Sequence, residues 1–297
     1  AWTAGVYLAV SGTACILGTL GNLLVLGSVV MYKPLRHRRN AFVVNLAVAD
    51  LTVTSFADPM GILGMVYGSE WFVRRVVLCD AVATVCIAAC VTALFSIGGD
   101  GFSRFCHICH PHAYHRLFTL RTNIIICIFI WLAGFGMSLP ALVGWTDNIY
   151  DPKYMECIWN RKYSMTYTIF FSTCVVAAPV AIIAISFIKI YIHVQSSRKR
   201  VAVYRNQSVN QAKSLSIKLA RSLFIVFTGF VACWTPYAII VIVDFKDRAP
   251  EEVHLFILLL AHMHSTLNAI IYAMSNAQFR KGYLVALTSL YPCSARF

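Results

Sequence analysis

The chain has 297 residues, of which 59% are hydrophobic and only 12% are charged, and its formal net charge is +13. Roughly a quarter of the residues in soluble domains are charged, so this composition excludes an ordinary soluble protein and indicates a membrane protein. The positive charge does not indicate a nucleic-acid partner, because basic residues in so apolar a chain are better explained as topology determinants beside anionic lipid.

Seven apolar stretches are each long enough to cross the hydrocarbon layer, which takes about 20 helical residues. In lipid, only helices and closed barrels satisfy the backbone, and the unbroken apolar run from Ile124 to Leu132 does not alternate as a barrel strand does. The sequence therefore predicts an all-α membrane protein, a seven-transmembrane helix bundle in one domain over residues 1–297. The expected spans lie near 4–31, 41–67, 76–106, 122–144, 164–192, 217–243 and 253–274.

Lysine and arginine are unevenly distributed between the two sets of loops. The loops after the first, third and fifth spans, and the tail, contain many basic residues and no acid, whereas the opposite loops mix both charges. Basic residues are retained on the cytoplasmic side. We therefore predict a multi-pass protein of the plasma membrane with an extracellular N-terminus and a cytoplasmic C-terminus, and a short cytoplasmic amphipathic helix near 276–287.

Polar side chains interrupt the spans at bilayer depth, where they are costly and usually functional. The carboxylate of Asp50 must face the bundle interior and find donors, and Asn22 and Asn268 are its expected partners. The alternative is a static hydrogen-bond network that only fixes helix register. The other polar residues at this depth are Asp100, His262 and His264. Bends that favour cavities and hinges are expected where a proline removes a backbone donor, at Pro59, Pro140, Pro179 and Pro236.

One marker in each span carries a resemblance to a known family. In chain order these are Gly21-Asn22, Leu46-Ala47-Val48-Ala49-Asp50, Cys79 with Arg104, Trp131, Pro179, Cys233-Trp234-Thr235-Pro236 and Asn268-Ala269-Ile270-Ile271-Tyr272. By these markers the chain resembles a rhodopsin-like (class A) G-protein-coupled receptor along nearly its full length. The resemblance implies a receptor, not an enzyme, that binds a small extracellular ligand and activates a heterotrimeric G protein.

Within that superfamily the segment from Arg104 to His110, and the alanine at Ala269, are similar to melatonin receptors. This resemblance implies coupling to the inhibitory class of G protein. The ligand positions differ, because Val175 stands where a histidine is expected and Arg161 where a glutamine is expected. An arginine at this place is instead similar to the carboxylate-reading arginine of medium-chain fatty-acid-type receptors. A receptor for a fatty acid or another carboxylate is therefore the alternative, and Arg161 as a solvated loop charge is the simpler explanation.

Two other ligand classes are excluded by single positions. Receptors for protonated amines carry an aspartate where this chain has Cys86, and retinal-binding relatives need a lysine where it has His262. A membrane transporter or channel is the alternative from another class, but it would need polar residues threaded through both halves, and often repeated halves. The polar residues here cluster in one middle and inner network.

The resemblance also implies roles for individual residues. The predicted ligand contacts are Cys86, Cys90, Arg161, Val175, Trp234 and His262. The predicted activation switch consists of Asp50, Arg104, Phe230, Trp234, Pro236, Asn268 and Tyr272.

Several positions depart from the family pattern. Ser103 replaces the acid that normally precedes Arg104, which predicts raised ligand-independent signalling unless Asp100, one turn earlier, supplies the missing pair. A sodium ion near Asp50 is the one cofactor considered, although Ala93 replaces the hydroxyl that normally assists it.

The cysteines divide by location. Cys79 and Cys157 are both placed on the oxidising side, where a disulfide between them would tie the second outer loop over the ligand entrance. The cysteines within spans, including Cys86 and Cys90, are interpreted as small buried hydrophobes and not as metal ligands. Cys293, in the tail, is a candidate for palmitoylation, with an unmodified thiol as the alternative. The Cys and His residues at 106–110 are explained by the family resemblance, so no metal site is predicted.

Overall fold

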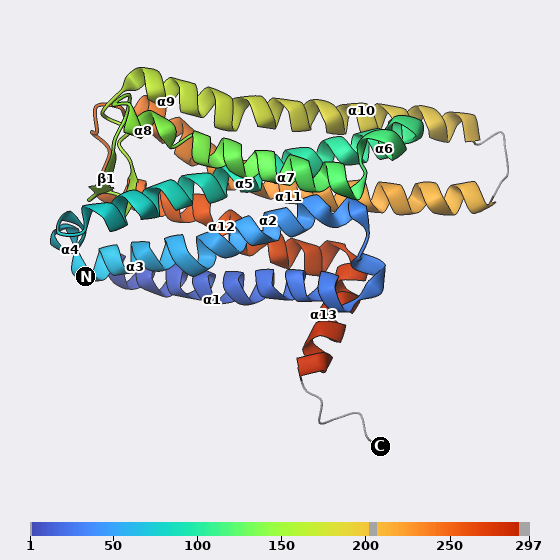
Figure 1. Ribbon diagram of the computed structural model, residues 1–297, viewed down its shortest axis with the longest axis horizontal. Coiled ribbons are helices and arrows are strands. Elements are labelled where there is room, and N and C mark those ends of the chain that lie inside the picture. The colour runs from blue at the N-terminus through green and yellow to red at the C-terminus, as the bar shows by residue number, and fades with distance from the viewer. Residues whose placement is uncertain (1, 202–206, 291–297) are drawn as a thin grey trace.

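The computed structural model describes residues 2–201 and 207–290, except for the side chains at 175, 178, 194, 196–201, 207–223 and 290. Within these ranges, seven helical segments are long and apolar enough to cross a membrane, and they lie side by side as a bundle (Figure 1). This confirms the predicted seven-helix fold. The segments are Trp2–Met31, Arg38–Tyr67, Val76–Cys109, Leu120–Leu142, Met165–His193, Phe224–Val243 and Glu251–Ser275.

The first three spans are built from α1 (Trp2–Met31), α2 (Ala41–Thr52), α3 (Asp58–Tyr67) and α5 (Val76–Cys109). Two single turns, η1 (Lys33–Leu35) and η2 (Arg38–Asn40), reverse the chain after α1, and α4 (Ser69–Val73) precedes α5. The long helix α5 is the centre of the bundle, since it packs against α2, α7, α10 and α11.

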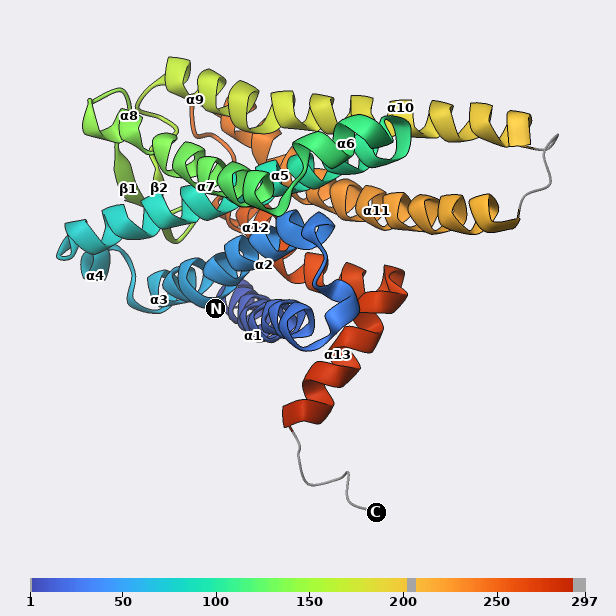
Figure 2. The ribbon, with the colours of Figure 1, turned by 45° about the vertical axis from the view of Figure 1, so that its right-hand side comes forward.

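The later spans comprise α7 (Leu120–Gly136) with α8 (Leu139–Leu142), then α9 (Met165–Phe171) with α10 (Ala178–Val201), α11 (Gln207–Val243) and α12 (Glu251–Ser275). A short helix, α6 (Pro111–Leu117), precedes α7. Helix α13 (Ala277–Leu290) follows α12 and leaves the bundle at an angle, as Figure 2 shows. Cys293 lies outside the described residues.

Wider π-helical turns lie just ahead of two prolines. The segment Val53–Ala57 joins α2 to α3 before Pro59, and Ser172–Ala177 joins α9 to α10 before Pro179. Proline has no backbone N–H and its ring crowds the preceding turn, so the regular helical ladder is interrupted there. Pro236 lies inside α11, and Pro140 is the second residue of the short α8, which follows the end of α7. The predicted proline positions thus coincide with irregular turns at Pro59, Pro140 and Pro179.

A two-stranded hairpin covers one end of the bundle. Strand β1 (Asn148–Asp151) pairs antiparallel with β2 (Glu156–Trp159), with Tyr150 opposite Cys157. The disulfide between Cys79 and Cys157, predicted from the sequence, ties β2 to the start of α5. We call this the hairpin end, and the opposite end, where α13 begins, the tail end (Figure 1).

Polar contacts and small residues bring the central helices together. Trp131 Nε1 on α7 donates to Asn45 Oδ1 on α2 at 3.1 Å, and Asn45 Nδ2 donates to Ser96 Oγ on α5 at 2.8 Å. A Cβ atom at Gly134 would lie 2.7 Å from the backbone oxygen of Ala88, so only glycine allows α7 to approach α5 this closely. Close approach and interhelical hydrogen bonds drive helix association in lipid, where apolar burial does not.

Candidate functional site

A chain of polar contacts runs through the middle of the bundle from Trp234. The indole Nε1 of Trp234 donates to His264 Nδ1 at 3.1 Å. Since an indole can only donate, this contact requires the tautomer that carries the imidazole proton on Nε2. That nitrogen lies 3.6 Å from Asp50 Oδ1, which is close but too long for a hydrogen bond, and Asn268 Nδ2 donates to Asp50 Oδ2 at 2.8 Å. Of the predicted switch residues, Trp234 is therefore bonded to His264, which lies beside the hydrogen-bonded pair of Asp50 and Asn268.

The tautomer of His264 determines which partners it connects. The carbonyl oxygen of Ala261 lies 2.7 Å from the same Nδ1 and would accept its proton in the other tautomer. The contact with Trp234 would then be lost, and Nε2 would become an acceptor for the Ser265 hydroxyl at 3.2 Å. Phe230 packs against both rings, stacked on Trp234 at 5.8 Å and edge-on to His264 at 4.9 Å.

One expected partner of Asp50 lies elsewhere. Asn22 Nδ2 donates to the backbone oxygens of Gly18 and Ser265, both at 3.0 Å. The amide of Asn22 therefore joins α1 to α12. The prediction that Asn22 pairs with Asp50 is wrong, and the prediction for Asn268 is confirmed.

A sodium ion near Asp50 stays a prediction. Hard cations take oxygen ligands, and Asp50 Oδ1 is buried without a hydrogen-bond partner among the described residues, whereas Asp50 Oδ2 is already bonded to Asn268. Ala93, which is fully buried on α5, contributes no oxygen from its side chain. No step is therefore assigned to sodium.

At the tail end, Arg104 pairs with an acid of its own helix. Arg104 Nε lies 3.3 Å from Asp100 Oδ1, one turn earlier on α5, and both side chains are buried. The contact is an ion pair without hydrogen-bond geometry. Tyr272 is buried nearby along α12 and stacks on Phe279 of α13 at 5.1 Å. Asp100 therefore supplies the acid that Ser103 does not.

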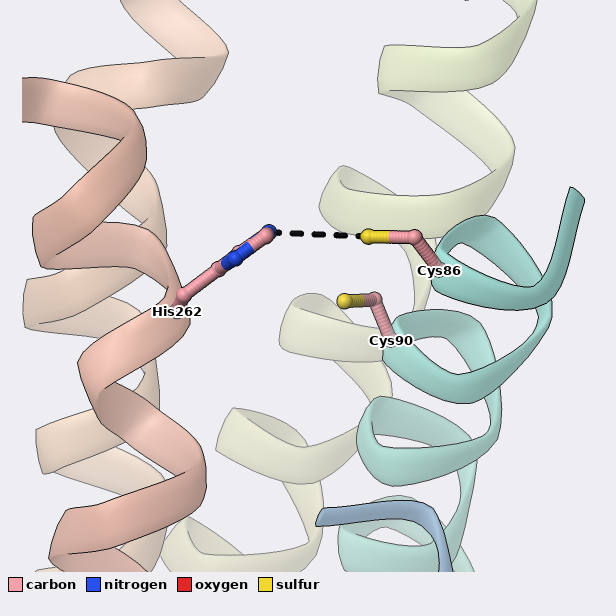
Figure 3. A group of neighbouring side chains, drawn as sticks. All are labelled: Cys86, Cys90 and His262. Atoms are coloured by element: carbon pink, nitrogen blue, oxygen red, sulfur yellow. Dashed lines mark hydrogen bonds between the residues drawn. The ribbon is translucent and has the colours of Figure 1, made fainter. Parts of the chain in front are cut away.

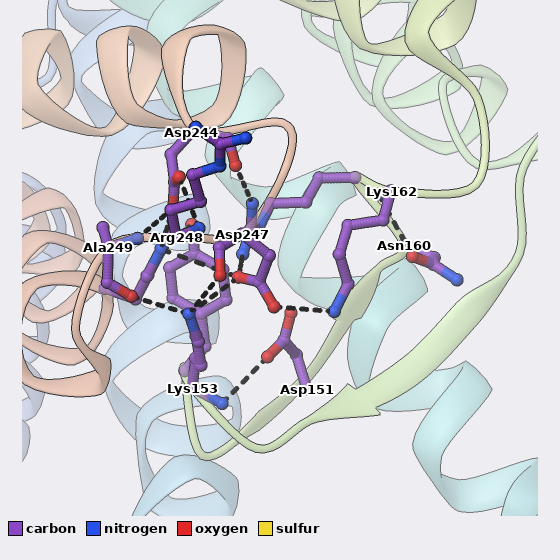
Figure 4. A network of polar contacts seen from close by, with 11 residues as sticks. Asp151, Lys153, Asn160, Lys162, Asp244, Asp247, Arg248 and Ala249 are labelled. Carbon is purple, nitrogen blue, oxygen red and sulfur yellow. Dashed lines mark hydrogen bonds and ion pairs between the residues drawn. The ribbon is translucent and has the colours of Figure 1, made fainter.

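At the hairpin end, three cationic side chains contact the carboxylate of Asp247. Lys153 Nζ lies 3.1 Å from Asp247 Oδ1 and Lys162 Nζ lies 3.0 Å from Oδ2 (Figure 4). The guanidinium of Arg161 also bonds to this carboxylate, and its Nη1 donates to the backbone oxygen of Asp244 at 2.9 Å. Partial burial alone would raise the pKa of Asp247, but the hydrogen bonds from Lys162, Lys153 and Arg161 hold that pKa well below its usual value.

Arg161 is thus a buried structural cation in this structure. Its side chain is only 1% exposed, whereas that of its neighbour Lys162 is 41% exposed. The guanidinium also lies 5.6 Å from the centre of the Tyr154 ring. The interpretation of Arg161 as a solvated loop charge is wrong, because the hairpin and the loop between α11 and α12 enclose it.

We expect Asp247→Ala to destabilise the protein strongly. It removes the acid that pairs with the buried Arg161, and orphaning one partner of a buried ion pair costs about 3–5 kcal/mol. Because the Asp247 side chain is 22% exposed, a loss of about 2–3 kcal/mol is expected after discounting for solvent. Thermal unfolding of the purified protein measures this loss of stability, with Lys162→Ala as the matched control. Equal effects of the two substitutions would contradict this.

Beneath the hairpin, acidic, imidazole and thiol groups from different elements meet. His262 Nδ1 on α12 lies 2.8 Å from Asp58 Oδ1 on α3, and its Nε2 lies 3.6 Å from Cys86 Sγ on α5. Glu156 on β2 is 3% exposed, and its Oε1 has no hydrogen-bond partner among the described residues. Desolvation raises the pKa of Glu156 to about 7, and the nearby charge of Asp58 adds to the rise.

This raised pKa predicts a pH-dependent stability. Because the folded protein holds the Glu156 proton more tightly than the unfolded chain, stability decreases as pH rises from about 4.5 to about 7. The full effect is on the order of 3 kcal/mol, at about 1.4 kcal/mol per pKa unit. Unfolding temperatures of the wild type and Glu156→Gln between pH 5 and 8 test this. The difference between them isolates Glu156, and parallel curves would refute the assignment.

Of the predicted ligand contacts, Cys86, Cys90 and His262 come together beneath the hairpin, and Trp234 lies at the start of the central polar chain. Val175 lies in the π-helical segment Ser172–Ala177, with its side chain outside the described ones. Arg161 belongs to the loop cluster.

Sequence reasoning missed Asp58 and Glu156. Asp58 adjoins the predicted bend at Pro59, and an acid beside a proline within a span was the available signal. Glu156 was interpreted as an ordinary loop charge because the hairpin that buries it was not predicted.

Comparison with known proteins agrees with this arrangement. Residues 21–272 match the family described as "7 transmembrane receptor (rhodopsin family)". The melatonin receptor type 1A of Phodopus sungorus is 31% identical over 95% of this chain and 80% of that receptor, and the human type 1B is 30% identical over 98% and 80%. The crystal structure of squid rhodopsin aligns with a TM-score of 0.82 at 18% identity, covering 99% of this chain and 88% of that one.

Proposed function

Because the chain belongs to the rhodopsin family of seven-transmembrane receptors and is similar to melatonin receptors along nearly its full length, we propose that it signals through an inhibitory heterotrimeric G protein. The hairpin end faces the extracellular side and the tail end faces the G protein, in agreement with the basic residues of the tail-end loops. The plasma membrane is the proposed location.

The observation that carries this proposal is the polar chain through the centre of the bundle. Trp234, His264 and Asp50 join α11, α12 and α2, and Asn268 extends the contact along α12 toward Tyr272. A ligand changes the equilibrium between two arrangements only as far as it binds one of them more tightly. A ligand beneath the hairpin would alter the packing around Trp234, and this chain would carry the change toward the tail end.

For the ligand we propose a small, uncharged molecule with hydrogen-bonding groups, as melatonin is, and not a carboxylate. Arg161 is 1% exposed and already bonded to Asp247, so a carboxylate ligand would have to compete with an internal partner for it. Asp58 and Glu156 lie beneath the hairpin, and their carboxyl groups would repel an anion when they are ionised. The unpartnered Oε1 of Glu156 can accept a hydrogen bond from a neutral ligand.

A cyclic-AMP assay in cells tests the proposal. We expect melatonin or a related neutral amide to lower forskolin-stimulated cyclic AMP, and medium-chain hydroxy fatty acids to have no effect. Glu156→Gln should weaken the response to the neutral ligand. Arg161→Ala should reduce the amount of folded receptor, and the responses to all ligands should therefore decrease equally. A response to fatty acids that Arg161→Ala abolishes at matched surface expression would refute the ligand class.

Asp100→Asn should raise ligand-independent signalling. It removes the acid that holds Arg104 against α5. If the inactive arrangement loses about 1 kcal/mol of stability, the equilibrium between the inactive and active arrangements shifts about fivefold toward the active one. Basal nucleotide exchange on the G protein, in membranes of equal receptor density, measures the change. Asp80→Asn, at an exposed acid of the same helix, is the control. If both variants have the wild-type basal rate, the pair does not restrain Arg104.

A further inference from the structure

Two buried thiols of α5 face a histidine of α12. Cys86 and Cys90 are four residues apart, so their side chains lie on one face of the helix, and His262 points toward them (Figure 3). The two Sγ atoms and a ring nitrogen of His262 lie within 4.8 Å of one another. All three side chains are buried, with exposed fractions of 8%, 7% and 6%.

We propose that Cys86, Cys90 and His262 form a binding site for one zinc ion. Thiolate sulfur and imidazole nitrogen are the ligands that zinc prefers, and two cysteines with one histidine form a known three-ligand zinc set whose fourth position stays open. This assignment goes beyond the proposed function, because it requires neither the extracellular ligand nor the G protein. It also revises the interpretation of these cysteines as ordinary hydrophobic side chains.

The spacing of the ligand atoms suits a tetrahedral centre. With Zn–S near 2.3 Å and Zn–N near 2.0 Å, tetrahedral angles place the ligand atoms about 3.5–3.8 Å apart. Cys86 Sγ and His262 Nε2 are already 3.6 Å apart. The widest separation, at most 4.8 Å, needs a contraction of about 1 Å, which rotation of one cysteine side chain supplies.

Asp58 orients the histidine for this role. Its Oδ1 lies 2.8 Å from His262 Nδ1, so that nitrogen carries the proton and the lone pair of Nε2 is directed toward Cys86. A carboxylate on the far nitrogen of a coordinating histidine is the usual outer partner in zinc sites, where it fixes the ring and raises its basicity. The histidine is therefore held ready for coordination without any movement of α3 or α12.

The charges also favour a dication at this depth. Both thiols lose their protons to solvent on coordination, so two thiolates neutralise Zn²⁺ and the buried centre gains no net charge. The carboxylates of Asp58 and Glu156 face the same region, and Glu156 Oε1 is buried without a hydrogen-bond partner among the described residues. An unpartnered buried carboxylate is stabilised by a nearby cation.

A second group with suitable distances, Asp244, Asp247 and His254, does not carry the same inference. Asp247 is occupied by lysine and arginine side chains, and Asp244 accepts the backbone N–H groups of Arg248 and Ala249 at 2.7 and 3.0 Å. Its oxygens are therefore committed to donors that a metal ion would have to displace.

Metal counting on the whole receptor tests the site. The wild type, purified in detergent and stripped with a chelator, is dialysed against Zn²⁺ and its metal content is measured by mass spectrometry. We expect the wild type to retain one more zinc ion per receptor than either of two variants, the double variant Cys86→Ser/Cys90→Ser and the single variant His262→Gln. Cd²⁺ should give a thiolate-to-metal absorption band only in the wild type and in variants that keep both thiols.

Matched variants separate this site from other thiols and from misfolding. Cys174→Ser, at an exposed cysteine, and His254→Gln, in the second group, should retain the ion. Asp58→Asn should keep the stoichiometry but weaken zinc affinity by about 10–100-fold. Each variant is compared only if its metal-free unfolding temperature is within the wild-type range, and Cys86→Ala/Cys90→Ala replaces the serine pair if that pair fails this test.

Zinc should also raise the unfolding temperature of the wild type and leave that of the double cysteine variants unchanged, because an ion that binds only the folded form stabilises it. Equal zinc content in the wild type and in both double cysteine variants would overturn the proposal. So would loss of the ion in Cys174→Ser, or the absence of any cadmium band in the wild type. These results are independent of the cyclic-AMP assay, so the two proposals can fail separately.

Discussion

Cys157→Ser should strongly lower the unfolding temperature of the receptor. The bond closes a sequence separation of 78 residues between α5 and β2, and removing a native disulfide typically costs about 2–5 kcal/mol. The lower half of that range is expected, because unfolding in a membrane leaves the spans inserted and so constrains the chain between the two cysteines. Thermal unfolding in detergent, with and without reductant, measures the loss.

The same variant should lose ligand binding, because β2 carries Glu156 directly before Cys157. Cys79→Ser and the double variant should match Cys157→Ser in both measurements, since all three remove one bond and their effects cannot add. Cys174→Ser is the control for loss of an unpaired thiol. A double variant that is clearly less stable than either single one would mean that the cysteines act independently.

The spans could be predicted from the sequence because the bilayer imposes one condition on each of them. A helix that crosses lipid must be about 20 residues long and almost entirely apolar, whatever its neighbours are. The tight crossing of Gly134 over Ala88, in contrast, depends on how α7 is rotated against α5, which no single span determines. Local composition therefore predicted the elements but not their contacts.

The site was predicted only where a contact lies within one element or belongs to a strong motif. The pairing of Asp100 with Arg104 follows from helical spacing alone. The contact of Arg161 with Asp247 joins two loops that are distant in the sequence and depends on a hairpin of four-residue strands. Strands that short give too weak an alternation of polar and apolar residues to be recognised. The burial of Glu156 was missed for the same reason.

Disrupting the central polar chain should affect signalling more than removing the disulfide does, and His264→Leu tests this expectation. The leucine keeps the apolar volume but leaves the indole N–H of Trp234 without its acceptor and Asp50 Oδ1 without its neighbour. A buried polar group that loses its partner costs about 1–3 kcal/mol. Coupling between two sites typically amounts to 1–3 kcal/mol, so agonist-stimulated nucleotide exchange should decrease at least about fivefold.

The measurement uses the agonist found in the cyclic-AMP assay and receptors at equal surface density. Thr266→Val is the matched control, because the Thr266 hydroxyl bonds to the Ala14 backbone oxygen at 3.0 Å, on the same helix but outside the chain. His264→Gln, which offers an acceptor to Trp234 and a donor to Asp50, should recover part of the response. An equal decrease in Thr266→Val would show that any buried hydrogen bond on α12 has this effect.

Trp234→Phe completes a cycle that separates a direct connection from two independent contributions. The substitution keeps an aromatic ring against Phe230 and removes the N–H that bonds to His264. If the signal passes through this bond, the double variant with His264→Leu should be no worse than the more affected single variant, because both remove one interaction. Additive losses would mean that Trp234 and His264 influence the tail end separately, and a contiguous polar path would then be the wrong description of how the receptor switches.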